Sequence, residues 1–270
     1  MQYMLAPIED ITSLSFRILA CRHGCDVAFT ELIRFESLAR NNKSTWERIE
    51  FSAKAPTVIQ VIGQREMWLK KFLSSFVPGE GFKGFCLNLG CPAPNFVNQG
   101  VGAAMIKRIS KVNKLIDVVK SRGYPVGVKM RLGLNQFEKD KKVYLNLLNS
   151  TNADYYIVHA RHGKESYNVP ADWSVFPECV ATGKKIVANG DVKTVSDVKK
   201  LETMGVVGVM IGRAAVTNPG IFDTLKGKES ASLDSLRKEY ESLSANEPFR
   251  YKKNVLKWMG GKSLTEEKIS

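Results

Sequence analysis

The sequence predicts a (β/α)8 barrel, the α/β fold in which eight parallel strands are each followed by a helix. Short apolar runs alternate with longer amphipathic runs eight times between residues 3 and 225, a pattern typical of a parallel sheet. The 270 residues are enough for one such barrel and a small appendage. Polar residues recur where the expected strands end, and this fold carries its active sites at that edge. An open, doubly wound sheet is the alternative architecture.

Each expected strand is a short apolar run bounded by polar residues, glycine or proline. The eight runs are 3–6, 26–30, 57–62, 83–89, 126–131, 154–159, 185–188 and 206–211. Thr12 is expected to cap a first helix that Gly24 ends, and Thr194 a later helix that reaches Met204. The other expected helices are a stretch with Leu32, Phe35 and Leu38, then 66–76, 111–121, 137–150 and a short one within 173–182.

The pattern changes after residue 225 to charged, helix-prone sequence with no expected strand. Apolar residues with helical spacing recur there, at Leu233, Leu236 and Tyr240 and again at Val255, Leu256 and Met259. We therefore expect two parts, a catalytic barrel over residues 1–225 and a small helical extension over residues 226–270.

The chain is strongly basic. Lysine and arginine outnumber aspartate and glutamate by 40 to 27, which gives a formal net charge of +13 and a pI of about 9.5. Clustered cations neutralise phosphates, so a nucleic acid is the first partner to consider, and a surplus of solubilising lysine is the alternative. The extension contributes Arg250, Lys252, Lys253, Lys257 and Lys262 to this charge.

Five cysteines, an odd number without C-x-x-C spacing, indicate a reducing compartment rather than a disulfide framework. Cys21 and Cys25 flank His23, but a fourth ligand and a zinc-like spacing are missing, so no metal is expected. The chain shows no signal-peptide pattern, and no apolar run approaches the roughly 18 residues of a membrane span. We expect a cytoplasmic monomer that does not contact a membrane.

The last two expected strands end in a pattern typical of a phosphate site. One strand continues into Asn189, Gly190 and Asp191, and the other into Gly212 and Arg213. These two strand ends form the usual phosphate site of the fold. Glycine lets backbone N–H groups approach an anion, and arginine adds a bidentate cationic contact. A single Gly-Arg pair is usually only a turn, but the pattern at both ends favours a phosphate.

The other strand ends are also polar, at Pro7, Glu31, Gln60, Asn88, Lys129, Arg131, His159 and Arg161. Half-buried polar groups are costly unless something satisfies them, so this set indicates a large polar ligand. Lys129 can stabilise negative charge on a reduced flavin ring, and Gln60 and His159 can hydrogen-bond that ring. The alternative for His159 is an ordinary core histidine.

Cys91 lies in the segment Asn88-Leu89-Gly90-Cys91-Pro92-Ala93-Pro94, just beyond the fourth expected strand. Its glycine and prolines predict a fixed loop over the mouth of the barrel. A thiol, with a free pKa of about 8.5, can donate a proton at neutral pH. The alternative for an isolated cysteine is a small buried apolar residue, which suits Cys86 and Cys179.

With these motifs the sequence resembles the tRNA-dihydrouridine synthase family over roughly residues 4–222. The matching stretches are LAPIEDIT, VIQVIGQ, LNLGCPAPNFVNQGVGAAMIKR, VGVKMRLG, IVHARHGKESY with ADW, IVANGDV and VMIGRAAVTNPGIF. The Asn-x-Gly-Cys-Pro loop, with Gly100-x-Gly102-Ala103-Ala104 after it, is the most specific of them.

The resemblance implies an enzyme that reduces uridine to 5,6-dihydrouridine in the D-loop of tRNA, using FMN and NADPH. By motif, the residues implied to hold FMN are Pro7, Ile8, Glu9, Gln60, Lys129, His159, Asn189, Gly190, Asp191, Gly212 and Arg213. Cys91 is implied to be the general acid, giving a proton to C5 of the uracil while a hydride from FMN goes to C6. Those implied to contact the substrate RNA are Asn88, Arg34, Arg131 and Arg161, with the extension completing the tRNA-binding surface.

Two other functions fit parts of the pattern. A small-molecule FMN oxidoreductase of the dihydroorotate dehydrogenase type would share the fold and the phosphate site but has no need of the basic charge. A non-catalytic RNA-binding barrel would use the charge but would bind no flavin.

Overall fold

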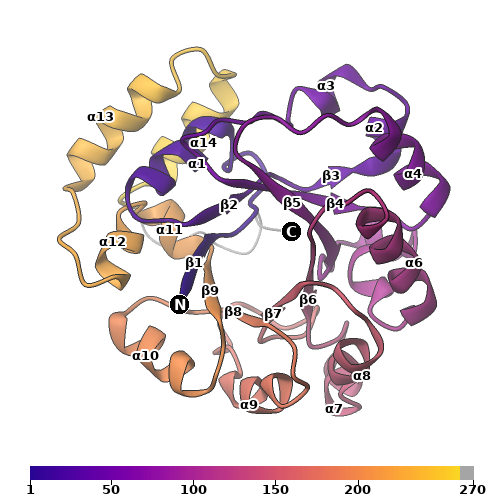
Figure 1. The fold of residues 1–270 in the computed structure, drawn as a ribbon. Helices are drawn as coiled ribbons and strands as arrows, with labels where there is room; N and C mark the ends of the chain where they lie inside the picture. The colour runs from indigo at the N-terminus through magenta and orange to yellow at the C-terminus, as the bar shows by residue number, and fades with distance from the viewer. Residues whose placement is uncertain (262–270) are drawn as a thin grey trace.

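In the computed structural model, which describes residues 1–261, eight parallel strands close into a barrel with helices outside it (Figure 1). The ring consists of β1 (Gln2–Leu5), β2 (Val27–Phe29), β4 (Thr57–Ile62), β5 (Phe82–Leu89), β6 (Val126–Arg131), β7 (Tyr155–His159), β8 (Ile186–Asn189) and β9 (Gly208–Ile211). It closes because β1 pairs with both β2 and β9, and β2 pairs with β4. The predicted (β/α)8 barrel is therefore confirmed, and the open sheet was the wrong alternative.

The helices outside the barrel follow the amphipathic runs of the sequence. They are α1 (Leu14–Arg22), α2 (Phe35–Ala39), α3 (Lys43–Trp46), α4 (Glu66–Ser75), α6 (Ile109–Lys120), α7 (Gln136–Asp140), α8 (Val143–Ser150), α9 (Phe176–Val180), α10 (Val195–Thr203), α11 (Arg213–Thr217) and α12 (Ile221–Leu225). Loops carry α5 (Pro94–Val97), η1 (Gly102–Met105) and η2 (Trp173–Val175). Thr194 caps α10 as predicted, in a reciprocal capping box with Asp197.

Three local predictions were wrong. Ser13, not Thr12, is the N-cap residue of α1, because the Thr12 hydroxyl is used in hydrogen bonds with the backbone of Ile8. The expected helix around Leu32 begins only at Phe35, since the preceding residues form a short strand, β3 (Ile33–Arg34), against the end of β4. The expected helix over 137–150 is divided into α7 and α8 because Lys142 adopts a left-handed conformation with φ of 50°.

The inside of the barrel is a small apolar layer formed by Met4, Ala6, Phe29, Val58, Cys86, Ile157, Val187 and Met210. Side chains alternate across a strand, so residues two positions further along face the same interior. Gln60, Asn88, His159 and Asn189 each lie two residues beyond a member of this layer. The apolar layer thus fills the barrel interior on the N-terminal side of these residues, and the polar side chains lie above it at the carboxyl ends of the strands.

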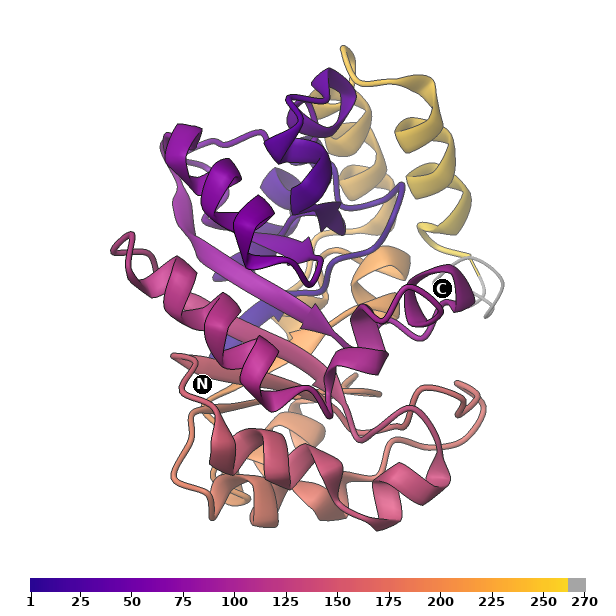
Figure 2. The same ribbon diagram turned by 90° about the vertical axis from the view of Figure 1, so that its right-hand side faces the viewer.

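Two helices after residue 225, α13 (Leu233–Leu243) and α14 (Phe249–Trp258), lie on one flank of the barrel (Figure 2). Tyr240 packs edge-on against Phe16 of α1, and the Glu247 carboxylate accepts hydrogen bonds from the Ser13 hydroxyl and the Ser15 N–H. Lys262 lies outside the described residues. Among residues 1–261, no helix has the length and apolar character needed to cross a membrane.

Candidate active site

A cavity of about 490 Å³ opens at the carboxyl ends of the strands. Its lining includes all the site residues that the sequence predicted, namely Pro7, Ile8, Glu9, Arg34, Gln60, Asn88, Cys91, Lys129, Arg131, His159, Arg161, Asn189, Gly190, Asp191, Gly212 and Arg213. The pairing register brings them together, since Lys129 is opposite Asn88, Arg131 opposite His159, and His159 opposite Asn189.

Gln60 offers the clearest sign that the cavity receives a polar ligand. Its side chain is 1% exposed, and its Oε1 accepts a hydrogen bond from Asn88 Nδ2 at 2.9 Å. Its Nε2 is buried and has no hydrogen-bond partner within residues 1–261, and the neighbouring Cys86 sulfur is only a weak acceptor. A buried donor without a partner costs about 1–3 kcal/mol, so a ligand acceptor at this position would offset that cost.

Asn88 connects Gln60 to the loop that carries Cys91. The Asn88 Oδ1 accepts hydrogen bonds from the backbone N–H groups of Gly90 and Cys91, at 3.1 and 2.9 Å. The Cys91 carbonyl accepts one from the Ala103 N–H at 2.9 Å. Gly102 has a φ of +59°, and a Cβ there would lie 2.6 Å from the Cys91 oxygen. The backbone of Cys91 is therefore hydrogen-bonded through both its N–H and its carbonyl. Position 102, beside that carbonyl, must be glycine.

Burial raises the pKa of the half-buried Cys91 thiol, although the cations of Arg131 and Lys129 oppose this effect. The thiol is consequently protonated at neutral pH. A fixed, protonated thiol on the cavity wall has the state that a proton donor needs.

The Lys129 side chain lines the same cavity, and its ammonium group makes no hydrogen bond or ion pair to any residue of the described chain. Burial, with a smaller contribution from the Arg131 charge, lowers the pKa of its ammonium group to about 8. The folded protein therefore holds a cation at an unfavourable position, which is typical of a site that binds an anionic group.

Lys129→Met should consequently stabilise the ligand-free protein at pH 7. The drop from the ordinary pKa of 10.5 to about 8 sets a ceiling of about 3 kcal/mol, and partial exposure to the cavity reduces the expected gain to about 1–2 kcal/mol. The pKa is lower in the folded state, so wild-type stability recovers as pH rises from about 8 towards 10.5. Denaturant unfolding of both proteins at pH 7 and 9.5 checks this. The prediction is contradicted if the difference in free energy of unfolding between Lys129→Met and the wild type is as large at pH 9.5 as at pH 7.

His159 is 6% exposed, and burial together with nearby cations keeps its pKa well below the ordinary value, so the ring is neutral. Its Nε2 lies 3.3 Å from a guanidinium nitrogen of Arg161, which can only donate. Nε2 is therefore the acceptor and Nδ1 carries the hydrogen. His159 can offer that N–H to a ligand, which distinguishes it from a histidine satisfied within the core.

Asp191 fixes two of the cavity's arginines. Its carboxylate accepts from Arg161, which is fully buried, and from Arg213 at 3.0 Å. Arg161 also donates to the Val169 carbonyl at 2.8 Å, so most of its guanidinium is used by the protein. Arg213 keeps more of its guanidinium free for a ligand.

Gly190 must be glycine in this arrangement. Its φ is +120°, and a Cβ would lie 2.9 Å from the Ala171 Cβ and 3.2 Å from the His159 ring. The Asn189 Nδ2 donates to the Met210 carbonyl at 2.9 Å and so joins the ends of β8 and β9. The backbone between these strands is therefore joined across β8 and β9, and Gly190 lets it line the cavity.

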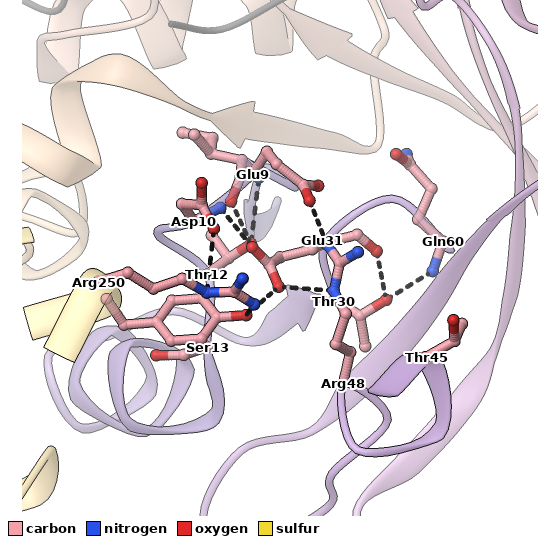
Figure 3. Close-up of polar contacts among 12 residues, drawn as sticks. Glu9, Asp10, Thr12, Ser13, Thr30, Glu31, Thr45, Arg48, Gln60 and Arg250 are labelled. Carbon is pink, nitrogen blue, oxygen red and sulfur yellow. Dashed lines mark hydrogen bonds and ion pairs between the residues drawn. The ribbon is translucent and has the colours of Figure 1, made fainter. Parts of the chain in front are cut away.

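The rim on the β1–β2 side contains a polar network around Glu31, which is 3% exposed (Figure 3). Its carboxylate accepts from the Asp10 N–H, from Arg48 Nε at 3.1 Å and from the Tyr251 hydroxyl at 2.7 Å. Arg48 also pairs with Glu9 on the cavity wall. The three clustered carboxylates of Glu9, Asp10 and Glu31 are thus already matched to cations and hydroxyl groups, including Arg250 near Asp10.

Arg34 reaches the cavity from β3 and lies over the Phe96 ring, with 4.8 Å from its guanidinium carbon to the ring centroid. Phe96 lies on α5, which follows Cys91 in the chain. The Arg34–Phe96 pair therefore borders the cavity on the side of the Cys91 thiol.

Comparison with known proteins identifies the family. The model of the family described as Dihydrouridine synthase (Dus) matches residues 4–254. The chain belongs to the dihydrouridine synthase family. It is 34% identical over 248 residues to a probable tRNA-dihydrouridine synthase 2 of Bacillus subtilis (strain 168), covering 87% of this chain and 76% of that protein. It is 31% identical over 248 residues to a probable tRNA-dihydrouridine synthase of Staphylococcus aureus (strain COL), covering 87% and 75%.

Solved structures support the fold of this chain. Morphinone reductase in complex with tetrahydroNAD superposes with a TM-score of 0.58, covering 92% of this chain and 93% of that one, at 11% sequence identity.

The sequence did not predict several cavity residues, among them Arg48, Phe96 and Tyr167. None of them lies at the end of a barrel strand, which was the signal used. The stretch IVHARHGKESY ends in Tyr167, but its composition gives no reason to place that side chain in the cavity.

Proposed function

We propose that this chain reduces uridine to 5,6-dihydrouridine in the D-loop of tRNA, with FMN as its cofactor and NADPH as the reductant. The observation that carries the proposal is the convergence on one cavity of three groups: a protonated thiol, the Gln60 Nε2 without a hydrogen-bond partner among the described residues, and the half-buried cation of Lys129. The names of its relatives and its net charge of +13 favour tRNA over a small-molecule substrate.

The residues present fit a flavin mononucleotide. The Gln60 Nε2 and the His159 Nδ1–H supply donors for the acceptor atoms of the ring, and Lys129 supplies a positive charge. Arg213 and the open backbone at Gly190 suit its phosphate. Pro7, Ile8 and Glu9 form the wall on the β1 side, where Ile8 provides an apolar surface.

Bound FMN, once reduced by NADPH, would supply the hydride that is added to C6 of the uracil. The chain itself positions the base and the proton. Unstacking the uridine from its neighbouring bases costs about a few kcal/mol of free energy, and contacts within the cavity must offset this cost. Asn88 uses one Nδ2 hydrogen on Gln60 and keeps the other for the uracil, while its Oδ1 holds the Cys91 loop. Cys91 gives its proton to C5, which completes the saturation of the C5–C6 bond.

The deciding experiment has two readouts. We expect the purified protein to bind FMN, and to produce dihydrouridine, detected by mass spectrometry, in tRNA from cells that lack this activity when NADPH is added. A protein that takes up no FMN and leaves such tRNA unmodified would refute the proposal. FMN binding with reduction of a small molecule alone would favour the oxidoreductase alternative.

We also propose that α14 contributes to tRNA binding. Lys253 and Lys257 are exposed four residues apart on this helix, and Arg250 at its start lies 3.4 Å from Asp10, beside the cavity rim. Charge reversal of both lysines should weaken tRNA binding and flatten its salt dependence by about 0.9 for each duplex phosphate that the helix no longer neutralises. FMN binding should not change. Filter binding at several salt concentrations measures this, with reversal of the exposed Lys199 and Lys200 on α10 as the matched control. An unchanged salt slope would place the RNA elsewhere.

A further inference from the structure

Tyr167 lies on the cavity wall, in the segment between β7 and η2, and contacts the cationic side of the site. Its ring is stacked on the neutral His159 ring, with centroids 5.9 Å apart and 25° between the planes. Three guanidinium groups lie around the same ring. Their carbon atoms are 4.2 Å (Arg213), 5.5 Å (Arg161) and 5.6 Å (Arg131) from its centroid.

Among the described residues, this arrangement places four cations around one carboxylate. Arg131, Arg161, Arg213 and Lys129 face one cavity, and Asp191 is the carboxylate that pairs with two of them. Like charges at such distances repel each other, so long side chains would separate unless something held them. The electron-rich face of an aromatic ring attracts guanidinium groups and can hold them without neutralising their charge.

The ring and the hydroxyl of Tyr167 make two separable contacts. The ring face receives Arg213, whose Nη2 is also bound to Asp191 at 3.0 Å, so this guanidinium is fixed from two directions. The hydroxyl accepts a hydrogen bond from Arg131 Nη2 at 3.0 Å, and Arg131 Nη1 donates to the His162 carbonyl at 3.0 Å. Arg131 is thereby fixed by two hydrogen bonds to the same segment of chain.

We propose that Tyr167 is a positioning residue that serves two ligands: its ring holds Arg213 for the cofactor phosphate, and its hydroxyl holds Arg131 for the RNA substrate. This inference rests on the proposed function. It assigns separate consequences to two substitutions at one residue, because phenylalanine keeps the ring and loses the hydroxyl, whereas leucine loses both.

The test measures FMN binding to the cofactor-free protein by the quenching of FMN fluorescence, and separately the kcat and KM for tRNA. Tyr167→Leu should raise the Kd for FMN on the order of tenfold, as expected when a cation–π interaction is removed at a partly buried site. Tyr167→Phe should leave that Kd within about twofold, and should raise the KM for tRNA severalfold with little change in kcat. Tyr144→Phe, which removes a hydroxyl bound to Glu178 outside the cavity, is the matched control and should change neither quantity.

Three results would overturn the inference. FMN binding by Tyr167→Leu at the wild-type Kd would show that the ring does not position Arg213. An equal rise in Kd for Tyr167→Phe and Tyr167→Leu would assign the effect to the hydroxyl. An unchanged KM for tRNA in Tyr167→Phe would remove the link to Arg131. If Tyr167→Leu does not fold, Tyr167→Met replaces it, since methionine fills more of the space and has no aromatic face.

These outcomes are distinct from failure of the proposed function. If wild-type protein bound no FMN and modified no tRNA, the function itself would be wrong. If the wild type were active and the Tyr167 variants matched it, only the positioning role would be lost.

Discussion

Cys91→Ala is expected to slow uridine reduction by about 10²–10⁴-fold, the range typical of a lost general acid, while FMN remains bound. The thiol is the protonated group on the loop that Asn88 and Ala103 hold over the cavity. Alanine retains the backbone of this loop, so the cofactor should bind as before. Single-turnover reduction of tRNA measures the effect, and consumption of NADPH without RNA should be unaffected.

Cys179→Ala is the matched control, because Cys179 is fully buried in α9 and does not line the cavity. It should leave the rate within about twofold, as most substitutions remote from a site do. The pH dependence gives a second check. Since burial raises the Cys91 pKa, the thiol stays protonated through neutral pH, and the wild-type rate should fall only at alkaline pH. Near-normal turnover by Cys91→Ala would show that the proton comes from another group.

The strands and their carboxyl ends could be predicted from the sequence because both depend on local pattern. The β4 and β6 strands were predicted residue for residue, since each is a short apolar run that begins directly after a proline. Once the barrel is closed, strand ends must lie together, and this alone places Gln60, Lys129 and His159 in one cavity.

The errors occurred where a nonlocal contact decided the structure. Thr12 has a suitable side chain for a helix cap, but its hydroxyl bonds to Ile8 and the helix begins one residue later. The local sequence at Ile33 and Arg34 is compatible with a helix, but both residues instead pair with the end of β4 as a short strand. Tyr167 and Arg48 reach the cavity from loops whose paths depend on the whole fold, so no spacing rule could assign them.

Asp191→Asn is expected to lower the free energy of unfolding by about 3 kcal/mol, the lower part of the range for breaking a buried ion pair. The substitution leaves Arg161 fully buried without its carboxylate partner, close to Arg131, Lys129 and Arg213. The backbone should not contribute, because Asp191 has a φ of 58° and asparagine tolerates this conformation well. Denaturant unfolding of the ligand-free protein measures the decrease.

Asp172→Asn provides the comparison, since Asp172 pairs with Lys139 at 2.9 Å near the surface and should cost less than about 1 kcal/mol. An anion separates an electrostatic effect from a packing defect. If the arginines are arranged to receive a phosphate, inorganic phosphate or FMN should restore part of the stability of Asp191→Asn by supplying the missing negative charge. A deficit that neither anion reduces would mean that Asp191 acts through the geometry of its loop, including its bond from the Ala171 N–H, rather than through its charge.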